Sequence, residues 1–390
     1  MSFVMPRPSS LREVTTPIFF DHAAGSPLRS DVALAMAEGL RGLPPNPSGS
    51  HSLARATRGV LEDARERIAA VLGVEAREIV FTGGGTESCN LALLGVMGPS
   101  AICISTVEHT AVRQAALEAA SLHGVPLVEL PVDSNGVLLV EKALELIPDG
   151  ALVSVMTANN ETGVTQPIAQ LRKALRHAPR NIIMHSDAIA AAPSSDVKEI
   201  VLACDLVSLA GHKLGGPPGT GVLVVKEGLR LKARNVGGGQ ELDRRAGTQD
   251  VAGALGMAVS LELAQRDRES GAVDALKQRR DQLEQSLAGA HPTLSVTAQR
   301  VPRLAGHLHL TVRDCRSEEL LMLLDQEGIC ASAGAACASG APQASHVLLA
   351  MGVDADVARG ALRLTLSTST TDEEVAVAER ALTQVLSKLS

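Results

Sequence analysis

Short apolar runs alternate with amphipathic stretches along the chain from about residue 60 to residue 226. Several of the runs have the length and composition of strands buried on both faces. These runs lie at 79–81, 101–105, 126–130, 152–156, 181–185, 206–209 and 221–225. Helical periodicity lies between several of them, at 61–72, 111–122, 138–147 and 168–176. Buried strands that alternate with helices predict a doubly wound α/β domain with a mostly parallel, seven-stranded sheet.

The pattern changes after the glycines at 237–239. Residues 251–289 have the composition of one or two long helices, 294–312 that of strands, and 317–327 and 372–388 are again helical. We therefore predict a large domain over 28–255 and a smaller α+β domain made of 1–27 and 256–390. Residues 331–345, ASAGAACASGAPQAS, consist largely of small residues and predict a mobile loop within the smaller domain.

Composition excludes several classes of protein. The 390 residues include 36 basic and 43 acidic side chains, four Phe, no Tyr and no Trp. A mildly acidic chain without a basic block and almost without aromatic side chains is not expected to bind nucleic acid or an anionic membrane. No apolar run has the length of a membrane span, and the first residues do not have the pattern of a secretory signal. The six cysteines lack disulfide-framework or metal-site spacing, which predicts a cytoplasmic protein without a metal.

The segment IVFTGGGTES at 79–88 is the first candidate for chemistry. An apolar run ends there in three glycines and a threonine, and a helix is expected to follow. Glycines let the backbone approach an anion closely, and a helix N-terminus offers free N–H groups to it. The pattern is neither a Walker loop nor GxGxxG, so a different phosphate ligand is indicated. An ordinary strand-to-helix turn is the alternative interpretation.

Two further segments place a lysine and an acid after predicted strands. Lys213 lies in LAGHKLGGPPGTG at 209–221, where burial would lower its pKa and leave the amine free to form a Schiff base. Asp187 lies in HSDAIAAAP at 185–193, where it either caps a helix or meets a cationic ligand. A phosphate cradle, a lysine and an acid together match the needs of pyridoxal 5′-phosphate (PLP), whose pyridine nitrogen an acid keeps protonated.

Ordered motifs along nearly the whole chain support this interpretation. They are DHAAGSPL (21–28), NPSGSH (46–51), FTGGGTESCN (81–90), VEHTAV (107–112), ANNETGVTQPI (158–168), HSDA (185–188), GHK (211–213), GGGQELDRRAGT (237–248), SAGAACAS (332–339), SHVLLAMG (345–352) and ALRLTLSTSTTDEE (361–374). With these motifs the chain resembles the NifS-like cysteine desulfurases and selenocysteine lyases of the class-V aminotransferase group. The resemblance implies the PLP-dependent transferase fold of type I and PLP as the cofactor.

The resemblance also implies roles for individual residues around the cofactor. Lys213 would hold PLP covalently and later move the α-proton of the substrate. Asp187 would pair with the pyridine nitrogen, and His109 would stack on the ring and take part in proton transfer. The residues implied to help hold the phosphate are Gly85, Thr86 and His212.

Four more positions would serve the substrate, the acceptor and the partner subunit. Asn160 would lie near the ring oxygen and the substrate, and Arg363 would clamp the substrate carboxylate with its guanidinium. Thr248 would reach the phosphate of the neighbouring subunit, which implies a homodimer. Cys337, in the mobile loop, would be the nucleophile that attacks the substrate sulfur or selenium, and a flexible loop suits a thiol that must reach an outside acceptor.

Two positions depart from the resembled family. Ala210 stands where the family usually has a serine, and an apolar residue at this position is a feature of selenocysteine lyases. Ala190 stands where the family usually has a glutamine that donates a hydrogen bond to the phenolic oxygen of the ring. Loss of that donor should change the pKa of the bound cofactor.

The sequence thus predicts a PLP-dependent enzyme that converts L-cysteine to L-alanine, forms a persulfide on Cys337 and passes the sulfur to an acceptor protein. Two alternatives stay open. A selenocysteine lyase would use the same residues and release selenide. A non-catalytic scaffold with the same fold would bind partners only, and the joint presence of Lys213, Asp187, His109, Arg363 and Cys337 argues against it.

Overall fold

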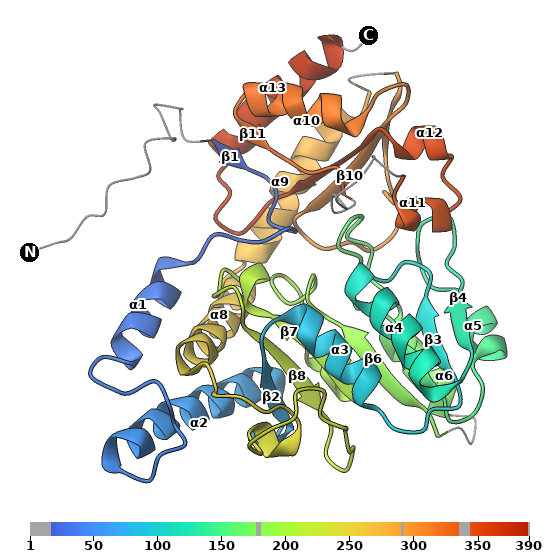
Figure 1. Ribbon diagram of the computed structural model, residues 1–390. Coiled ribbons are helices and arrows are strands. Elements are labelled where there is room, and N and C mark those ends of the chain that lie inside the picture. Colours follow the sequence, from blue (N-terminus) through green and yellow to red (C-terminus); the bar gives the residue numbers. More distant parts are fainter. Residues whose placement is uncertain (1–16, 177–180, 290–291, 335–343, 389–390) are drawn as a thin grey trace, which may run out of the picture.

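A seven-stranded sheet forms the centre of the larger part of the molecule (Figure 1). The computed structural model describes residues 17–176, 181–289, 292–334 and 344–388. The sheet has the order β2-β8-β7-β6-β5-β3-β4, in which β8 is antiparallel to both neighbours and all other adjacent pairs are parallel. Its strands are β2 (Ile79–Thr82), β3 (Ile102–Ser105), β4 (Leu127–Leu130), β5 (Leu152–Ser154), β6 (Ile183–Asp187), β7 (Leu206–Ala210) and β8 (Gly221–Val225). The predicted fold class is therefore confirmed.

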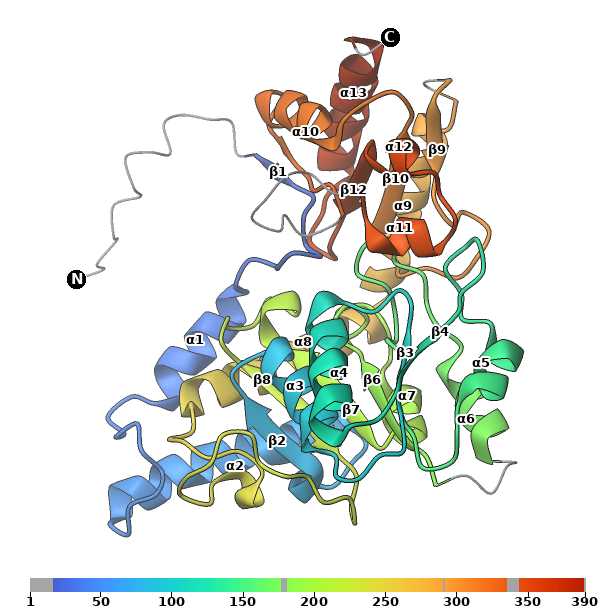
Figure 2. The ribbon, with the colours of Figure 1, turned by 45° about the vertical axis from the view of Figure 1, so that its right-hand side comes forward.

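Helices cover both faces of this sheet, and alternate strand residues point into two separate cores. In β2, Ile79 and Phe81 belong to one core and Val80 to the other. The first core lies under α2 (Ser52–Leu72), α5 (Val140–Leu146), α6 (Ile168–Arg176), α7 (Lys198–Ala203) and α8 (Val251–Glu269). The second lies under α3 (Gly85–Gly95) and α4 (Thr110–His123), which pack side by side in Figures 1 and 2. Burial on both faces explains why these strands are apolar almost throughout.

The smaller part of the molecule has its own core. A three-stranded antiparallel sheet has the order β12-β10-β9, and the short β1 pairs in parallel with β11. Its elements are β1 (Ile18–Phe19), α9 (Ala272–Leu287), β9 (Leu294–Val296), β10 (His307–Val312), α10 (Ser317–Gln326), β11 (Ile329–Cys330), α11 (His346–Ala350), α12 (Ala355–Ala358), β12 (Ala361–Thr365) and α13 (Asp372–Lys388). Leucines on α9, α10 and α13 pack against β10 and β12.

The packing of helix α8 (Val251–Glu269) indicates where the boundary between the two domains lies. Six of its buried apolar residues, between Val251 and Ala264, belong to the core of the large sheet, and the helix also packs on α2 and α1 (Ser30–Gly39). A boundary at residue 255 would fall inside this helix. We therefore propose that the large domain extends beyond 255 and that the second part of the small domain begins near the start of α9.

An unusual turn precedes α8. Glu241, Leu242 and Asp243 all have positive φ values, between 51° and 61°, a region that side chains other than glycine rarely adopt. The Glu241 carboxylate lies at 5% exposure and accepts from both terminal nitrogens of the Arg65 guanidinium at 2.8 and 2.9 Å. This buried ion pair holds the turn against α2 and the start of the sheet and leaves Leu242 64% exposed.

The structure refines the predicted element boundaries. The seven predicted strands lie within two residues of the observed ones. Helix α2 begins at Ser52 instead of 61, because the His51 ring caps it by accepting from the Ala54 amide at 3.2 Å. The elements that were not predicted are helices α1, α7, α11 and α12, strands β1, β11 and β12, and three short 3₁₀ turns, η1 (Ala76–Glu78), η2 (Gly211–Lys213) and η3 (Glu241–Asp243). Across the described residues, no helix combines the length and the apolar character needed to cross a bilayer.

Candidate active site

A cavity of about 300 Å³ lies at the edge of the large sheet where the parallel strands end. Ligands bind at this edge in α/β sheets because loops and helix N-termini gather there. The cavity brings together most of the predicted site residues, namely Gly85, Thr86, His109, Asn160, Asp187, His212 and Lys213. Ala190 lines it as well.

One wall of the cavity is the turn from β2 into α3. Gly84 has a φ of 137°, which favours glycine, and a Cβ on Gly85 would come within 2.3 Å of the Ile189 side chain. Glycine is therefore required for the strand to enter the helix directly. The first N–H groups of a helix have no partner within it and carry a partial positive charge, so this wall offers an anion site of the predicted kind.

Lys213 lies in η2, directly after β7, and borders the cavity. Its amine donates to the backbone carbonyls of Ala23 and Ala24, the latter at 2.8 Å. Burial lowers the pKa of Lys213 to about 8, with a further contribution from Arg363, while Asp21 and Asp187 oppose the shift. This shift raises the neutral fraction of the amine at neutral pH well above that of an ordinary lysine, as a nucleophilic or basic lysine requires.

Asp187, at the end of β6, is 6% exposed. Its Oδ1 accepts from the Ile189 amide at 2.9 Å, and the Cys89 thiol lies 3.8 Å from its Oδ2. Burial raises the pKa of Asp187 and outweighs its neighbours, chiefly the Ile189 amide and His109, which stabilise the charged form. A protonated ring nitrogen bound in the cavity would supply the missing positive charge.

Two histidines line the cavity in neutral form. The Nδ1 of His109 caps α4 by accepting from the Ala111 amide at 3.1 Å, which places the ring proton on Nε2. Burial lowers the pKa of His109, and it lowers that of His212 to about 4. A neutral, capped ring is held in one orientation and is suited to lie flat against an aromatic ligand.

Glu108 is a buried acid outside the set of site residues that the sequence predicts. Its Oε1 accepts from the Ser105 hydroxyl at 2.6 Å and from the Met156 amide at 2.8 Å, while Oε2 has no partner among the described residues. Burial raises the pKa of Glu108 to about 8. The side chain thus fixes the loop that carries His109. A glutamate between an apolar residue and a histidine is the only sequence signal for it.

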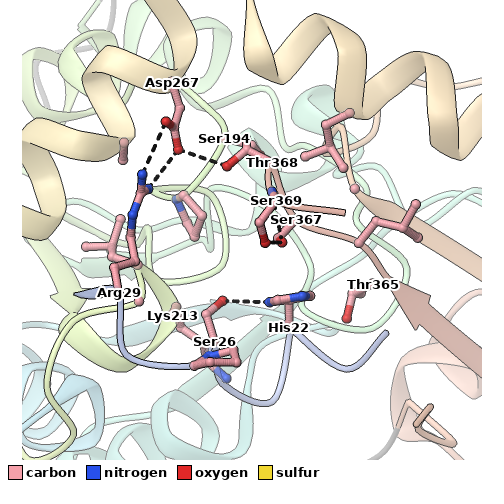
Figure 3. Close-up of a pocket in the computed structure, with 18 of the residues that line it drawn as sticks. His22, Ser26, Arg29, Ser194, Lys213, Asp267, Thr365, Ser367, Thr368 and Ser369 are labelled. Carbon is pink, nitrogen blue, oxygen red and sulfur yellow. Dashed lines mark hydrogen bonds and ion pairs between the residues drawn. The ribbon is translucent and has the colours of Figure 1, made fainter. Parts of the chain in front are cut away.

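A second cavity of about 510 Å³ adjoins the first, and Figure 3 shows many of its polar side chains. Lys213 and Ala190 line both cavities. Arg29 pairs with Asp267 at 2.8 Å, and the Thr368 hydroxyl donates to the same carboxylate at 2.9 Å. These contacts join the start of α1, the end of α8 and the segment after β12.

Two predicted site residues do not line the cavities, and a third lies outside the described residues. Arg363 is buried beside the first one, where its Nη1 donates to the carbonyl of Asn160 at 3.1 Å and its Nη2 pairs with Asp21 at 2.7 Å. Thr248 is exposed, although its loop is tied to the glycine turn through Arg245, which pairs with Glu87 at 2.8 Å. Cys337 and most of its predicted loop lie outside the described residues.

The residues present fit PLP by the chemistry of their donors and acceptors. The helix N-terminus with its glycines suits the phosphate, and the buried, under-stabilised Asp187 suits a pyridine N–H. Lys213 supplies an amine with a lowered pKa between them. The fit lacks a side-chain donor at Ala190 and a hydroxyl at Ala210, in line with the two departures seen in the sequence.

Known proteins match this chain over most of its length. Residues 18–377 match the family model "Aminotransferase class-V". A Mycobacterium tuberculosis protein named "IscS-like cysteine desulfurase" is 39% identical over 369 residues, which cover 92% of this chain and 93% of the relative. A Dictyoglomus turgidum protein named "Cysteine desulfurase IscS" is 36% identical, with 95% of each chain covered.

Solved structures show the same likeness. A structure titled "NifS-like protein" superimposes with a TM-score of 0.86 at 30% identity and covers 95% of this chain and 100% of its own. One titled "SspA in complex with cysteine" superimposes with a TM-score of 0.75 at 28% identity and covers 90% and 99%. The match over most of the length, together with the cavity and its residues, shows that the chain belongs to the class-V aminotransferase family, in its NifS-like group.

Proposed function

We propose that the chain is a PLP-dependent cysteine desulfurase that converts L-cysteine to L-alanine and leaves a persulfide on Cys337. The observation that carries the proposal is the cavity in which the Lys213 amine, buried Asp187 and His109 surround a helix N-terminus. The atoms balance in this reaction: the substrate's C–S bond breaks, its sulfur joins the sulfur of Cys337, and the Cβ gains a proton. Several relatives that match most of the chain bear the name cysteine desulfurase, which supports the assignment.

Bound PLP supplies an electron sink that stabilises negative charge next to the reacting carbon. The residues of the chain do the rest. Asp187 would accept from the ring N–H, His109 would lie against the ring, and the glycine turn would hold the phosphate. Lys213, with a pKa lowered to about 8, accepts and returns the proton at the substrate Cα.

The five cysteines that the structure describes favour Cys337 as the nucleophile. Each of them has its pKa raised, chiefly by burial, so each stays a protonated thiol at neutral pH. A thiol, unlike a thiolate, is a poor nucleophile. We therefore propose Cys337, and a sulfur-acceptor protein as the recipient of its persulfide.

A selenocysteine lyase is the second candidate, and Ala210 is the observation that favours it. This residue ends β7, is 1% exposed and lies beside Gly85, where a serine hydroxyl would reach the phosphate site. Alanine release should be measured from L-cysteine and L-selenocysteine in parallel with the purified protein. Release from cysteine together with persulfide on the protein supports the desulfurase, whereas release from selenocysteine alone supports the lyase. If the protein neither binds PLP nor releases alanine, the result supports the non-catalytic scaffold.

We further propose a homodimer in the cytoplasm. Thr248 lies exposed on a loop that also presents Val236, 84% exposed, and Leu242, 64% exposed. Leu34 on α1 adds a further apolar side chain, 62% exposed. Large exposed apolar side chains are the kind of surface that a second copy of the chain covers.

Shared active sites predict complementation between two inactive variants. Lys213→Ala chains mixed with Thr248→Val chains should form heterodimers in which one site carries both defects and the other carries neither. Activity should recover in part after subunit exchange, relative to each variant alone. Mass spectrometry of the intact dimer verifies the exchange. Exchanged heterodimers without recovered activity would show that Thr248 acts within its own subunit.

Replacing Ala190 with glutamine tests the missing donor. The new amide should reach the cavity that Ala190 lines and donate to the phenolic oxygen of bound PLP. The pH midpoint of the cofactor absorbance should shift relative to the parent. The rate of cysteine conversion should rise, and its activation free energy should fall by no more than the value of one charge-assisted hydrogen bond, about 1–3 kcal/mol. Ala191→Gln is not a suitable control because Ala191 is buried, so we compare Ala190→Leu, which fills similar space without a donor. Equal titrations for all three proteins would show that Ala190 is neutral.

A further inference from the structure

Asp21 accepts from one nitrogen of Arg363, the arginine that would bind the substrate carboxylate in the proposed function. It lies in the N-terminal strap, defined here as residues 20–26, which runs along β12. The Thr365 amide donates to the Phe20 carbonyl at 2.7 Å, and the Ala23 amide donates to the Thr365 hydroxyl at 2.9 Å. Figure 3 shows His22 of the strap next to Thr365. The strap thereby places the Asp21 carboxylate 2.7 Å from Nη2 of Arg363, 342 residues away in sequence.

The donors of Arg363 are largely in use. Nη1 donates to the carbonyls of Asn160 at 3.1 Å and Gly334 at 3.3 Å, and Nη2 donates to Asp21. Nε is buried and has no partner among the described residues. A guanidinium carries five N–H groups, so the donors left over are the Nε–H and one N–H of Nη2. A buried donor without a partner is costly, and a ligand carboxylate would satisfy it.

A substrate carboxylate on those donors would share one guanidinium with Asp21. Two carboxylates would then lie close together beside Arg363, which is only 4% exposed, and the Asp21 side chain is 22% exposed, so water and salt screen their repulsion only in part. Arg363 does not depend on Asp21 alone for its position, because the two backbone carbonyls hold Nη1. Replacing Asp21 should therefore change ligand binding mainly through the loss of its charge. The loss of its contribution to the orientation of Arg363 should matter less.

Resting on the proposed function, we propose that Asp21 is a specificity-determining residue: its charge weakens the hold of Arg363 on the α-carboxylate and disfavours ligands with a second anionic group. The consequence is an arginine site that is nearly neutral before the substrate arrives. Such a site favours an amino acid with one carboxylate, and it lets the product leave.

The test uses Asp21→Asn in the PLP-loaded protein. Asparagine keeps an oxygen that can accept from Nη2 but removes the charge. L-alanine, which has the α-carboxylate and lacks sulfur, is titrated against the absorbance of the bound cofactor to give a Kd without turnover. L-aspartate, which adds a second carboxylate, is titrated in the same way. The matched control is Asp356→Asn, which breaks an exposed Asp–Arg pair whose two side chains are 84% and 55% exposed.

We expect Asp21→Asn to lower the Kd for L-alanine by about ten-fold or more and the Kd for L-aspartate by a larger factor, with the control unchanged. The sign distinguishes this role from a structural one, because loss of a merely structural contact would weaken binding. Asp21→Ala is the second variant, and it should also bind L-alanine more tightly than the parent.

Two results would overturn the inference. If both variants turn over cysteine but bind L-alanine with the parent Kd or more weakly, Asp21 does not act by charge on this site, and the proposed function stands. If neither the parent nor the variants bind L-alanine or convert cysteine, the proposed function fails and the inference fails with it.

Discussion

Cofactor-free protein that is mixed with PLP and then treated with borohydride should carry the cofactor covalently on Lys213. The reaction needs the neutral amine. Because the pKa of Lys213 is lowered to about 8, the neutral form becomes dominant above that value, and the rate of capture should rise with pH through about 8. An ordinary lysine would require a pH above 10. Peptide mass spectrometry at each pH measures the site and the extent of labelling.

Lys213→Ala should lose the covalent label and at least about 10³-fold in the rate of alanine formation, since both the attachment point and the base are removed. Lys226 provides a matched control. Its amine also donates to two backbone carbonyls, those of Leu202 at 3.0 Å and Cys204 at 3.5 Å, and it lines neither cavity. Lys226→Ala should keep both the label and the rate. Labelling of another lysine, or a midpoint near 10, would contradict the assignment.

Cys337→Ala should keep the cofactor and stop persulfide formation. The variant retains the cavity residues, so its cofactor absorbance should match the parent, while alanine formation from L-cysteine should fall by about 10³-fold or more because the nucleophile is missing. Intact-mass measurement after addition of cysteine detects the mass of one added sulfur atom on the parent.

Cys315→Ala is the control for that experiment. Cys315 is 8% exposed, its pKa is raised by burial and by nearby Glu319 and Asp314, and it belongs to the core of the smaller part of the molecule. Its replacement should leave persulfide formation intact. Persulfide on the Cys337→Ala protein at the parent level would assign the nucleophile to another cysteine.

Much of the fold could be predicted from the sequence because its strands are buried on both faces. Continuous apolar runs such as 206–209 stand out against polar connections, so all the strands of the large sheet were located. Helix α1 could not be predicted in the same way, because one side chain alone, Val32, is buried along it and the rest of its surface is exposed or half-buried. The division into domains depends on where α8 packs, which its composition does not reveal.

The candidate site was predictable where a motif carries its own chemistry. The glycine turn, Lys213 and Asp187 each follow a strand, and the parallel sheet brings those strand ends to one edge. The contacts of Arg363 were not predictable. Its partner Asp21 lies in a different motif near the start of the chain, and only the strand-like pairing with Thr365 brings the two together. Glu108 could not be predicted because its burial, which raises its pKa, leaves only a weak signal in the sequence, the apolar Val107 and His109 on either side.

The path of the N-terminal strap matters for how the protein can be altered. The two backbone carbonyls that accept from Lys213 and the carboxylate that pairs with Arg363 lie between residues 21 and 24, while the side chains they serve lie 189 to 342 residues further on. A truncation that deletes residues of the strap would therefore remove groups that contact Lys213 and Arg363. Circular permutation that joins residue 17 to the end of α13 would preserve the strap, whereas a new terminus inside it would separate the lysine from its acceptors.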